Sequence, residues 1–311
     1  MEVEYKPSTM PVVMRSVMYT PGNNPKLIEK ARTFNADVIV LDLEDSVPPA
    51  EKIKARDMVR DSIPKVAESG ADIYVRINDW GTGLTEGDLE AIVQPKLSGI
   101  VLPKTESPED VVKLDEKLTE LEEKRGIKPG SIAVQLLIET AKGVVNVYQS
   151  AIASDRVNSL VFGAVDYTRD MRIELTKEGN EILPARSQVA IAARAANLVA
   201  IDTPWPPFKD VEGFIRDTKF GRQLGYEGRM LIHPNQIEPS HEIYSPPKDD
   251  VDYAREVVKV FEEGMKKGLA SVPLRGKMLD WAVYRTARDV LAKADLIAEY
   301  EKLKSERAKK S

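Results

Sequence analysis

The chain has 311 residues, of which 42% are hydrophobic and 31% are charged. The apolar residues suffice for a sizeable hydrophobic core, and the charged residues for its surface. This composition excludes disordered and collagen-like proteins. With 45 basic and 50 acidic residues the net charge is −5, which argues against nucleic acid as a main partner.

The residue types that are missing limit the chemistry of any site. No cysteine occurs, which excludes disulfides, iron–sulfur clusters, thiolate zinc sites and cysteine nucleophiles. His233 and His241 are the two histidines, so a site built from several imidazoles is excluded as well. A bound metal must then be held mostly by oxygen atoms, which favours Mg²⁺, Mn²⁺ or Ca²⁺.

The N-terminal segment MEVEYKPSTM lacks the apolar stretch of a signal peptide. No uncharged apolar run reaches the length of about 18 residues that a membrane-spanning helix requires. We therefore expect a cytoplasmic protein.

Short β-rich segments alternate with helical patterns along the chain. The segments are apolar without helical periodicity, as expected for strands that are buried on both faces. The predicted strands cover residues 16–20, 38–43, 72–77, 99–103, 132–138, 159–164, 198–202 and 229–233. This alternation predicts a parallel (β/α)₈ TIM barrel, and an open, doubly wound sheet is the alternative.

Two of the intervening helices carry clear start signals. Asn24 precedes Pro25 and Ser107 precedes Pro108, so in both cases a capping side chain stands before a proline at the first helical position.

The pattern changes after His233. Residues 235–250 are rich in proline, serine and charge, and residues 251–268 and 278–310 have the pattern of helices. We predict a catalytic barrel over residues 1–245 and a C-terminal helical extension over residues 246–311.

Polar residues stand at the C-terminal ends of the predicted strands, where the loops of a parallel barrel converge. A single charge after a strand is usually solvated or caps the next helix. Several acids together with an arginine are harder to explain in that way. The set consists of Glu44, Asp45, Arg76, Lys104, Glu139, Asp166, Asp202 and His233.

Glu139 and Asp166 follow adjacent strands, so their carboxylates are expected to lie close together. Two facing acids need a proton, a cation or a basic side chain between them. Because cysteine is absent and histidine rare, Mg²⁺ completed by water and substrate is the candidate. The alternative for Glu139 is that it favours the N-terminus of the following helix. Arg76 either neutralises these acids or holds a substrate carboxylate or thioester oxygen.

Other motifs are weaker. The glycine-rich loop 80–87 lacks a well-placed acidic partner, so a dinucleotide site is not expected. Lys104 resembles an ordinary loop lysine more than a Schiff-base lysine. His233 is either a general base, a ligand or a packed histidine. Lys26 and Lys30 flank a helix start that suits an anion, or they lie on a solvated face.

The order of these motifs resembles the citrate lyase β-subunit-like family, the acyl-CoA carbon–carbon lyases that include malyl-CoA and citramalyl-CoA lyases, within the HpcH/HpaI aldolase superfamily. The combination is specific because the matches span nearly the whole chain in the family order. The matching segments are RSVMYTPGNNPKLIEKA, VIVLDLEDSVPPAEKIKAR, VRIN, VLPK, LIETAKGV, LVFGAVDYTRDM, AIDTPW, GYEGRMLIHPNQI, EIYSPP and GKMLDWAVYRTA.

The resemblance implies roles for the residues at the strand ends. It assigns Mg²⁺ to Glu139 and Asp166, and contacts with the acyl and carboxylate oxygens of the substrate to Arg76. Glu44 and Asp45 match acids that support these groups.

The resemblance also implies a coenzyme A site. The positions that match coenzyme A or substrate contacts are Tyr19, Lys30, Ile232 and His233. Asn24 stands where relatives carry an arginine near the coenzyme A phosphates, and Lys26 is the candidate replacement.

The C-terminal match implies a lid. Family members that act on free coenzyme A esters place an aspartate over a neighbouring subunit, and Asp280 stands at that position. The alternative is that Asp280 simply caps the last helix. A shared site implies a homo-oligomer, either a trimer or a hexamer.

Together these matches imply Mg²⁺-dependent, reversible cleavage of a 3-hydroxy-3-carboxyacyl-CoA, such as malyl-, citramalyl- or citryl-CoA. The products are acetyl-CoA or another acyl-CoA and a 2-oxoacid. Arg76 is expected to stabilise the enolate and Asp280 to move the proton. The alternatives are a citrate lyase subunit that acts on citryl groups bound to acyl-carrier protein, an acyl-CoA thioesterase, and a non-catalytic metal-binding interaction protein.

Overall fold

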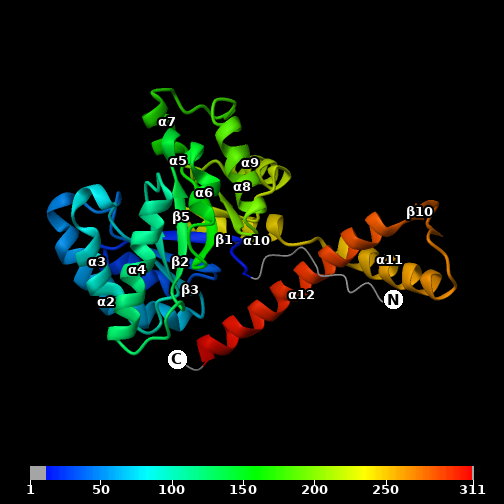
Figure 1. Cartoon of the computed structure of the whole chain (residues 1–311), viewed down its shortest axis with the longest axis horizontal. Coiled ribbons are helices and arrows are strands. Elements are labelled where there is room, and N and C mark those ends of the chain that lie inside the picture. The colour runs from blue at the N-terminus through cyan, green and yellow to red at the C-terminus, as the bar shows by residue number, and fades with distance from the viewer. Residues whose placement is uncertain (1–11, 310–311) are drawn as a thin grey trace.

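Eight parallel strands form a closed barrel at the centre of the molecule (Figure 1). The structure, a computed structural model, describes residues 12–309. The strands are β1 (Ser16–Pro21), β2 (Val38–Asp42), β3 (Asp72–Arg76), β4 (Gly99–Leu102), β5 (Ala133–Ile138), β6 (Val157–Phe162), β7 (Val199–Asp202) and β8 (Gly228–Leu231). β1 pairs with both β2 and β8, so the predicted TIM barrel is confirmed and the open sheet is excluded.

Helices surround the barrel. They are α1 (Pro25–Ala31), α2 (Lys52–Val66), α3 (Thr85–Ile92), α4 (Pro108–Lys124), α5 (Ala141–Val145), α6 (Val147–Ala151), α7 (Ala164–Met171), α8 (Leu183–Ala195), α9 (Val211–Leu224) and α10 (Ile237–Tyr244). Short 3₁₀ turns cover Pro49–Glu51, Ala67–Ser69, Trp80–Thr82 and Pro234–Gln236.

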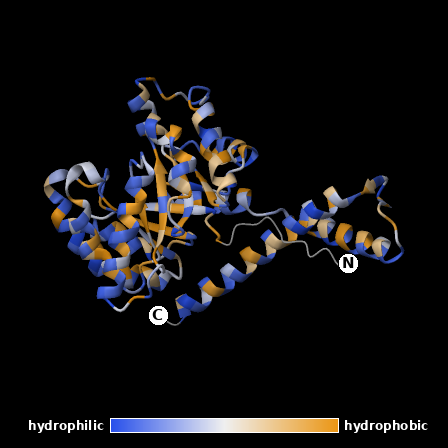
Figure 2. Cartoon of the chain, in the orientation of Figure 1, coloured by the Kyte–Doolittle hydropathy of each residue, from blue (hydrophilic) through white to orange (hydrophobic). Residues whose placement is uncertain are grey.

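The strands are apolar on both faces because two cores meet on them. In β2, Val38 and Val40 belong to the cluster inside the barrel, whereas Ile39 and Leu41 belong to the cluster between strands and helices. Figure 2 accordingly shows hydrophobic strands at the centre and helices of mixed hydropathy around them. This two-sided burial explains why the strands have no polar alternation in the sequence.

The two predicted helix starts are present. Asn24 Oδ1 accepts hydrogen bonds from the backbone N–H groups of Lys26 and Leu27, at 3.1 and 3.2 Å. At the start of α4, Ser107 forms a capping box with Asp110. Both caps satisfy N–H groups that a helix cannot pair internally.

The C-terminal part forms an arm that projects from the barrel (Figure 1). It consists of α11 (Lys248–Lys266), the hairpin β9 (Val272–Leu274) and β10 (Lys277–Leu279), and the first part of α12 (Trp281–Lys309). The arm has its own apolar cluster, in which Phe261 is fully buried. From the tip, α12 runs back toward the barrel.

The structure differs from the predicted elements in this part of the chain. Residues 237–244 form α10 although the sequence pattern there is irregular, and the hairpin occupies the residues at which a helix from 278 was predicted to begin. Within residues 12–309, no helix combines the length and the apolar character needed to cross a bilayer.

Candidate active site

Arg76 is anchored at the carboxyl ends of β2 and β3. It is the last residue of β3 and stands in register with Asp42, the last residue of β2. The Arg76 Nε and Nη2 groups donate hydrogen bonds to the two Asp42 carboxylate oxygens, at 2.7 and 2.6 Å. Arg76 Nη1 lies 3.1 Å from Glu44 Oε2 and 3.6 Å from Asp45 Oδ2. The bidentate pair therefore fixes one edge of the guanidinium and leaves the Nη1 edge for other acids.

Asp42 is a site residue that the sequence analysis missed. Burial works to raise the pKa of Asp42, but the charge and hydrogen bonds of Arg76 outweigh it and hold that pKa below its usual range. The sequence could have indicated this pair, because Asp42 and Arg76 end neighbouring parallel strands and such residues lie side by side.

Glu139 follows β5 and is almost completely buried, with 2% of its surface exposed. Its Oε1 atom accepts a hydrogen bond of 2.9 Å from the backbone N–H of Lys104. A Cβ atom at Gly163 would lie 2.8 Å from Glu139 Oε2, so a glycine is needed to make room for this carboxylate.

The charge on Glu139 is poorly compensated by the protein. Burial raises the pKa of Glu139 to about 8, and the negative charges of Asp166 and Glu44 add to the rise. Arg76 and the N–H of Lys104 act in the opposite direction but do not cancel it. A buried carboxylate in this position gains from a nearby cation.

Asp166 lies in the first turn of α7, with one-fifth of its side chain exposed. Its partner is the exposed Arg169, whose Nη2 lies 2.9 Å from Asp166 Oδ1. An exposed i,i+3 pair of this kind contributes little, so Asp166 is available to a second cation. Two carboxylates, one buried and under-compensated, fit the oxygen ligands that Mg²⁺ prefers.

Lys104, which was predicted to be an ordinary loop lysine rather than a Schiff-base lysine, pairs with acids at the strand ends. Its Nζ group donates a hydrogen bond to Glu44 Oε1 and lies 3.6 Å from Asp79 Oδ2. Burial works to lower the pKa of Lys104, but the hydrogen bond to Glu44 outweighs it and raises that pKa. The amine therefore stays protonated, which also disfavours a Schiff base.

Tyr19 lies inside the barrel rather than at its rim. The centre of the Arg76 guanidinium is 5.3 Å from the Tyr19 ring centroid. The Tyr19 hydroxyl is buried and has no hydrogen-bond partner among the described residues. The Tyr19 ring therefore packs near the Arg76 guanidinium from inside the barrel.

The other residues predicted to contact coenzyme A lie on α1, at its N-cap and on the loop after β8. The strands β1 and β8, which precede these segments, are neighbours. Asn24 caps α1, and Lys26 and Lys30 are exposed on it. Ile232 is exposed, whereas His233 stacks on Phe208 with its Nδ1 atom 2.7 Å from Asn235 Oδ1. These residues form a rim on the side of β1 and β8, and their hydrogen bonds run to neighbouring residues rather than to Glu139 or Asp166.

Asp202 and Asp280 lie outside the carboxylate cluster. Asp202 is fully buried and bonded to Arg186 of α8, so it joins a strand to a helix. Asp280 Oδ1 accepts a hydrogen bond of 2.9 Å from Val283 N and caps α12. It directly follows β10, which lies at the tip of the arm, far from the barrel of the same chain (Figure 1).

A cavity of about 210 Å³ opens between the loops that precede α8 and α9. Ala164 and Thr203 contribute its wall on the barrel side, and Leu175, Ile182 and Trp205 make much of the rest apolar. Neither Glu139 nor Asp166 lines it, so the cavity does not enclose the carboxylates.

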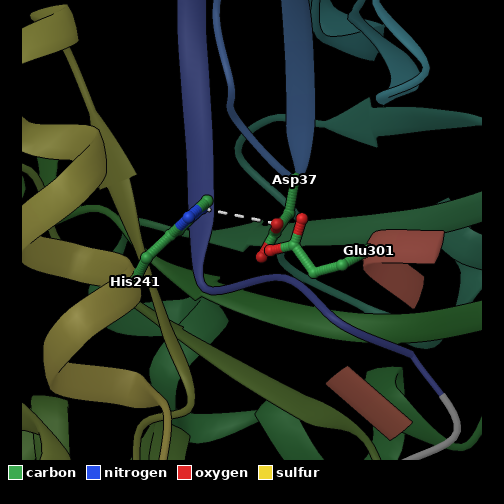
Figure 3. Close-up of side chains that lie close together, drawn as sticks. All are labelled: Asp37, His241 and Glu301. Carbon is green, nitrogen blue, oxygen red and sulfur yellow. Dashed lines mark ion pairs between the residues drawn. The ribbon is translucent and has the colours of Figure 1, made fainter. Parts of the chain in front are cut away.

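A second acidic cluster lies at the amino ends of the strands. One potential ligand atom each from Asp37, His241 and Glu301 lies within 4.8 Å of the others (Figure 3). Here Arg15 Nη2 already pairs with both acids, at 2.8 Å from Asp37 Oδ1 and 2.5 Å from Glu301 Oε1. Because the Arg15 guanidinium compensates these charges, we interpret the cluster as an ion-pair network that stabilises the fold and not as a metal site.

The sequence profile of the HpcH/HpaI aldolase/citrate lyase family matches residues 15–234. The chain is 37% identical to the citrate lyase subunit beta of Leuconostoc mesenteroides subsp. cremoris over 281 residues, which cover 90% of this chain and 93% of that protein. It is 31% identical to human mitochondrial citramalyl-CoA lyase, with 92% of this chain and 86% of that protein covered.

Two further relatives bear on the type of site. The (3S)-malyl-CoA thioesterase of Cereibacter sphaeroides is 31% identical, with 92% of this chain and 96% of that protein covered. The crystal structure of the protein CitE from Mycobacterium tuberculosis in complex with magnesium, acetoacetate and coenzyme A has a TM-score of 0.72 and 27% identity, and covers 92% of this chain and 100% of that one. These matches confirm the resemblance drawn from the motifs: the chain belongs to the HpcH/HpaI aldolase/citrate lyase family.

Proposed function

We propose that this protein is a Mg²⁺-dependent carbon–carbon lyase that splits a 3-hydroxy-3-carboxyacyl-CoA into an acyl-CoA and a 2-oxoacid. The observation that carries the proposal is the buried, under-compensated Glu139, which Asp166 and Arg76 influence, at the end of the barrel where TIM-barrel sites lie. The relatives named citrate lyase subunit beta and citramalyl-CoA lyase, and the related structure solved with magnesium and coenzyme A, support a lyase. The relative named (3S)-malyl-CoA thioesterase supports the thioesterase as an alternative.

Glu139 and Asp166 would hold the Mg²⁺, and Mn²⁺ suits the same oxygen ligands. When bound, the ion supplies Lewis acidity to the carboxylate and hydroxyl oxygens of the 2-oxoacid part.

Arg76 would stabilise the charge that develops on the acyl-CoA part. Cleavage moves the electron pair of the carbon–carbon bond onto the thioester, which becomes an enolate. The planar guanidinium, fixed on one edge by Asp42, offers positive charge and N–H donors to that oxygen. Glu44 and Asp45 orient its other edge.

Asp280 would protonate the enolate carbon while the substrate hydroxyl loses its proton, so the proton count balances without a co-reactant. Its position at the tip of the arm supports delivery to a neighbouring subunit rather than to its own barrel. The active enzyme would then be a homo-oligomer, a trimer or a hexamer.

The rim around α1 and the β8 loop would bind coenzyme A. The exposed Lys26 and Lys30 provide positive charge for phosphate groups, and Lys26 stands in for the arginine that Asn24 replaces. Ile232 and His233 would line the same opening.

The test is incubation with malyl-, citramalyl- and citryl-CoA, with and without Mg²⁺. A lyase releases a 2-oxoacid and keeps the thioester, whereas a thioesterase releases free thiol. The chain contains no cysteine, so a thiol reagent reports released coenzyme A without background from the protein.

Two other outcomes separate the remaining functions. Turnover of citryl-acyl-carrier protein but of none of the free coenzyme A esters would identify a citrate lyase subunit. This is the second candidate, because the relative from Leuconostoc mesenteroides is a citrate lyase subunit beta. Absence of all turnover would favour a non-catalytic binding protein.

A further inference from the structure

Lys104 has an unusual backbone conformation for its residue type. Its φ angle is +45°, in the left-handed region that long side chains rarely occupy. It follows β4 and Pro103, at the carboxyl end of the barrel. A residue persists in this conformation only where its surroundings hold it there, and such residues cluster at functional sites.

The left-handed turn gives Lys104 contacts with residues that follow three different strands. Its backbone N–H donates to Glu139 Oε1 at 2.9 Å, after β5. Its side chain donates to Glu44 Oε1, after β2, and approaches Asp79 after β3. Lys104 thus contacts acids around the site with both its backbone N–H and its side-chain ammonium.

The two contacts act on different acids of the site. Since the N–H of Lys104 donates to Glu139 Oε1, the oxygen that keeps more of its capacity for a cation is Oε2, on the Gly163 side. Since the ammonium neutralises Glu44 from the Oε1 side, Glu44 draws less on the charge of Arg76, which lies 3.1 Å from Oε2.

We propose that Lys104 is a positioning residue with two separable roles. Its backbone N–H orients Glu139 toward the divalent cation, and its ammonium neutralises Glu44 so that Arg76 keeps its positive charge for the substrate. The inference rests on the proposed function and deepens it.

Substitutions separate the two roles. Lys104→Gly and Lys104→Ala both remove the ammonium, but glycine adopts positive φ without strain whereas alanine does not. Lys104→Arg keeps the charge. Lys96 is the matched control, because it also has positive φ (+77°) and lies exposed before the amino end of the same strand.

The measurements are Mn²⁺ affinity, followed by calorimetry, and kcat and KM for the thioester that the wild-type protein cleaves. We expect Lys104→Gly to bind Mn²⁺ within about twofold of wild type and Lys104→Ala to bind it about fivefold or more weakly. Both variants should lose about tenfold in kcat/KM, which Lys104→Arg should largely restore. Lys96→Gly and Lys96→Ala should match wild type in both measurements.

Equal Mn²⁺ affinity of Lys104→Gly and Lys104→Ala would overturn the backbone role, and unchanged kcat/KM in Lys104→Gly would overturn the ammonium role. Both results require a wild-type protein that binds Mn²⁺ and turns over. A wild-type protein that does neither overturns the proposed function itself, and this inference falls with it.

Discussion

The two ends of the barrel both bury charged side chains, but they balance the charge differently. At the amino end, Asp37 is paired with Arg15, whose Nε and Nη2 groups donate to its two oxygens at 2.9 and 2.8 Å. At the carboxyl end, burial raises the pKa of Glu139 to about 8 in spite of Arg76. The ion pairs at the amino end stabilise the fold. A buried carboxylate that no basic side chain among the described residues neutralises, as at the carboxyl end, indicates a binding site for a ligand or cation.

The amino end is also closed by the chain itself. The Tyr300 hydroxyl of α12 donates a hydrogen bond of 2.6 Å to the backbone carbonyl of Asp37, and Lys304 Nζ donates to the carbonyl of Asn35 at 2.9 Å. α12 approaches so closely that a Cβ atom at Gly70 would collide with the carbonyl oxygen of Lys304. The same helix that carries Asp280 before its first turn is thereby anchored on the barrel.

The largest effect is expected at the unbalanced end. Glu139→Gln should lower kcat/KM by about 10³-fold, because it removes a charge that the bound cation needs. Far-UV circular dichroism and the melting temperature should stay close to wild type or improve, since the folded protein no longer has to protonate this carboxylate or bury its charge. Retained activity in this variant would refute the assignment of Glu139.

The next effect concerns Arg76. Arg76→Lys keeps the charge but loses the bidentate fork on Asp42, so we expect a loss of about tenfold to a hundredfold in kcat/KM. Arg15→Lys is the matched variant at the other end, and it should lower stability while leaving kcat/KM of the folded protein unchanged. Steady-state kinetics and thermal melts are measured for both variants. Equal losses in kcat/KM would contradict the difference between the two ends.

A smaller effect is expected from loosening α12. Lys304→Met removes a buried donor and leaves the carbonyl of Asn35 without it, which should reduce the free energy of unfolding by about 1–3 kcal/mol. Urea denaturation measures the loss, and Mn²⁺ affinity should not change. A variant as stable as wild type would show that the contact is not needed.

The smallest effect is a dependence on pH. Burial lowers the pKa of His241, so the unfolded chain binds this proton more readily than the folded protein. Stability should therefore fall as pH decreases below about 6.5, by no more than about 1.4 kcal/mol per pH unit from this one group. Thermal melts between pH 5 and 8 should show a weaker slope in His241→Gln, and an identical slope would exclude His241 as the cause.

Much of the barrel could be predicted from the sequence because its strands are short apolar runs between capped helices. Strand ends were less certain. β6 runs from Val157 to Phe162 instead of from 159 to 164, because α7 already begins at Ala164. The β9–β10 hairpin and α10 lack a strong local pattern and owe their form to packing.

The candidate site could be predicted only in part. Residues that end strands, such as Arg76 and Glu139, are visible from the alternation of elements. Asp42 was missed because its role depends on the register between β2 and β3. The contacts of Lys104 were not predicted, because the local sequence indicates neither its backbone conformation nor its contact with Glu44.

One measurement tests the comparison between the two ends most directly: Mn²⁺ binding to wild type, Glu139→Gln and Glu301→Gln, followed by electron paramagnetic resonance. The same chemical change is made at each acidic cluster, and Glu301 belongs to the one that Arg15 compensates. We predict that Glu139→Gln weakens Mn²⁺ binding by about tenfold or more, while Glu301→Gln binds as wild type does. Loss of binding in Glu301→Gln, with binding retained in Glu139→Gln, would place the metal at the amino end and contradict the account.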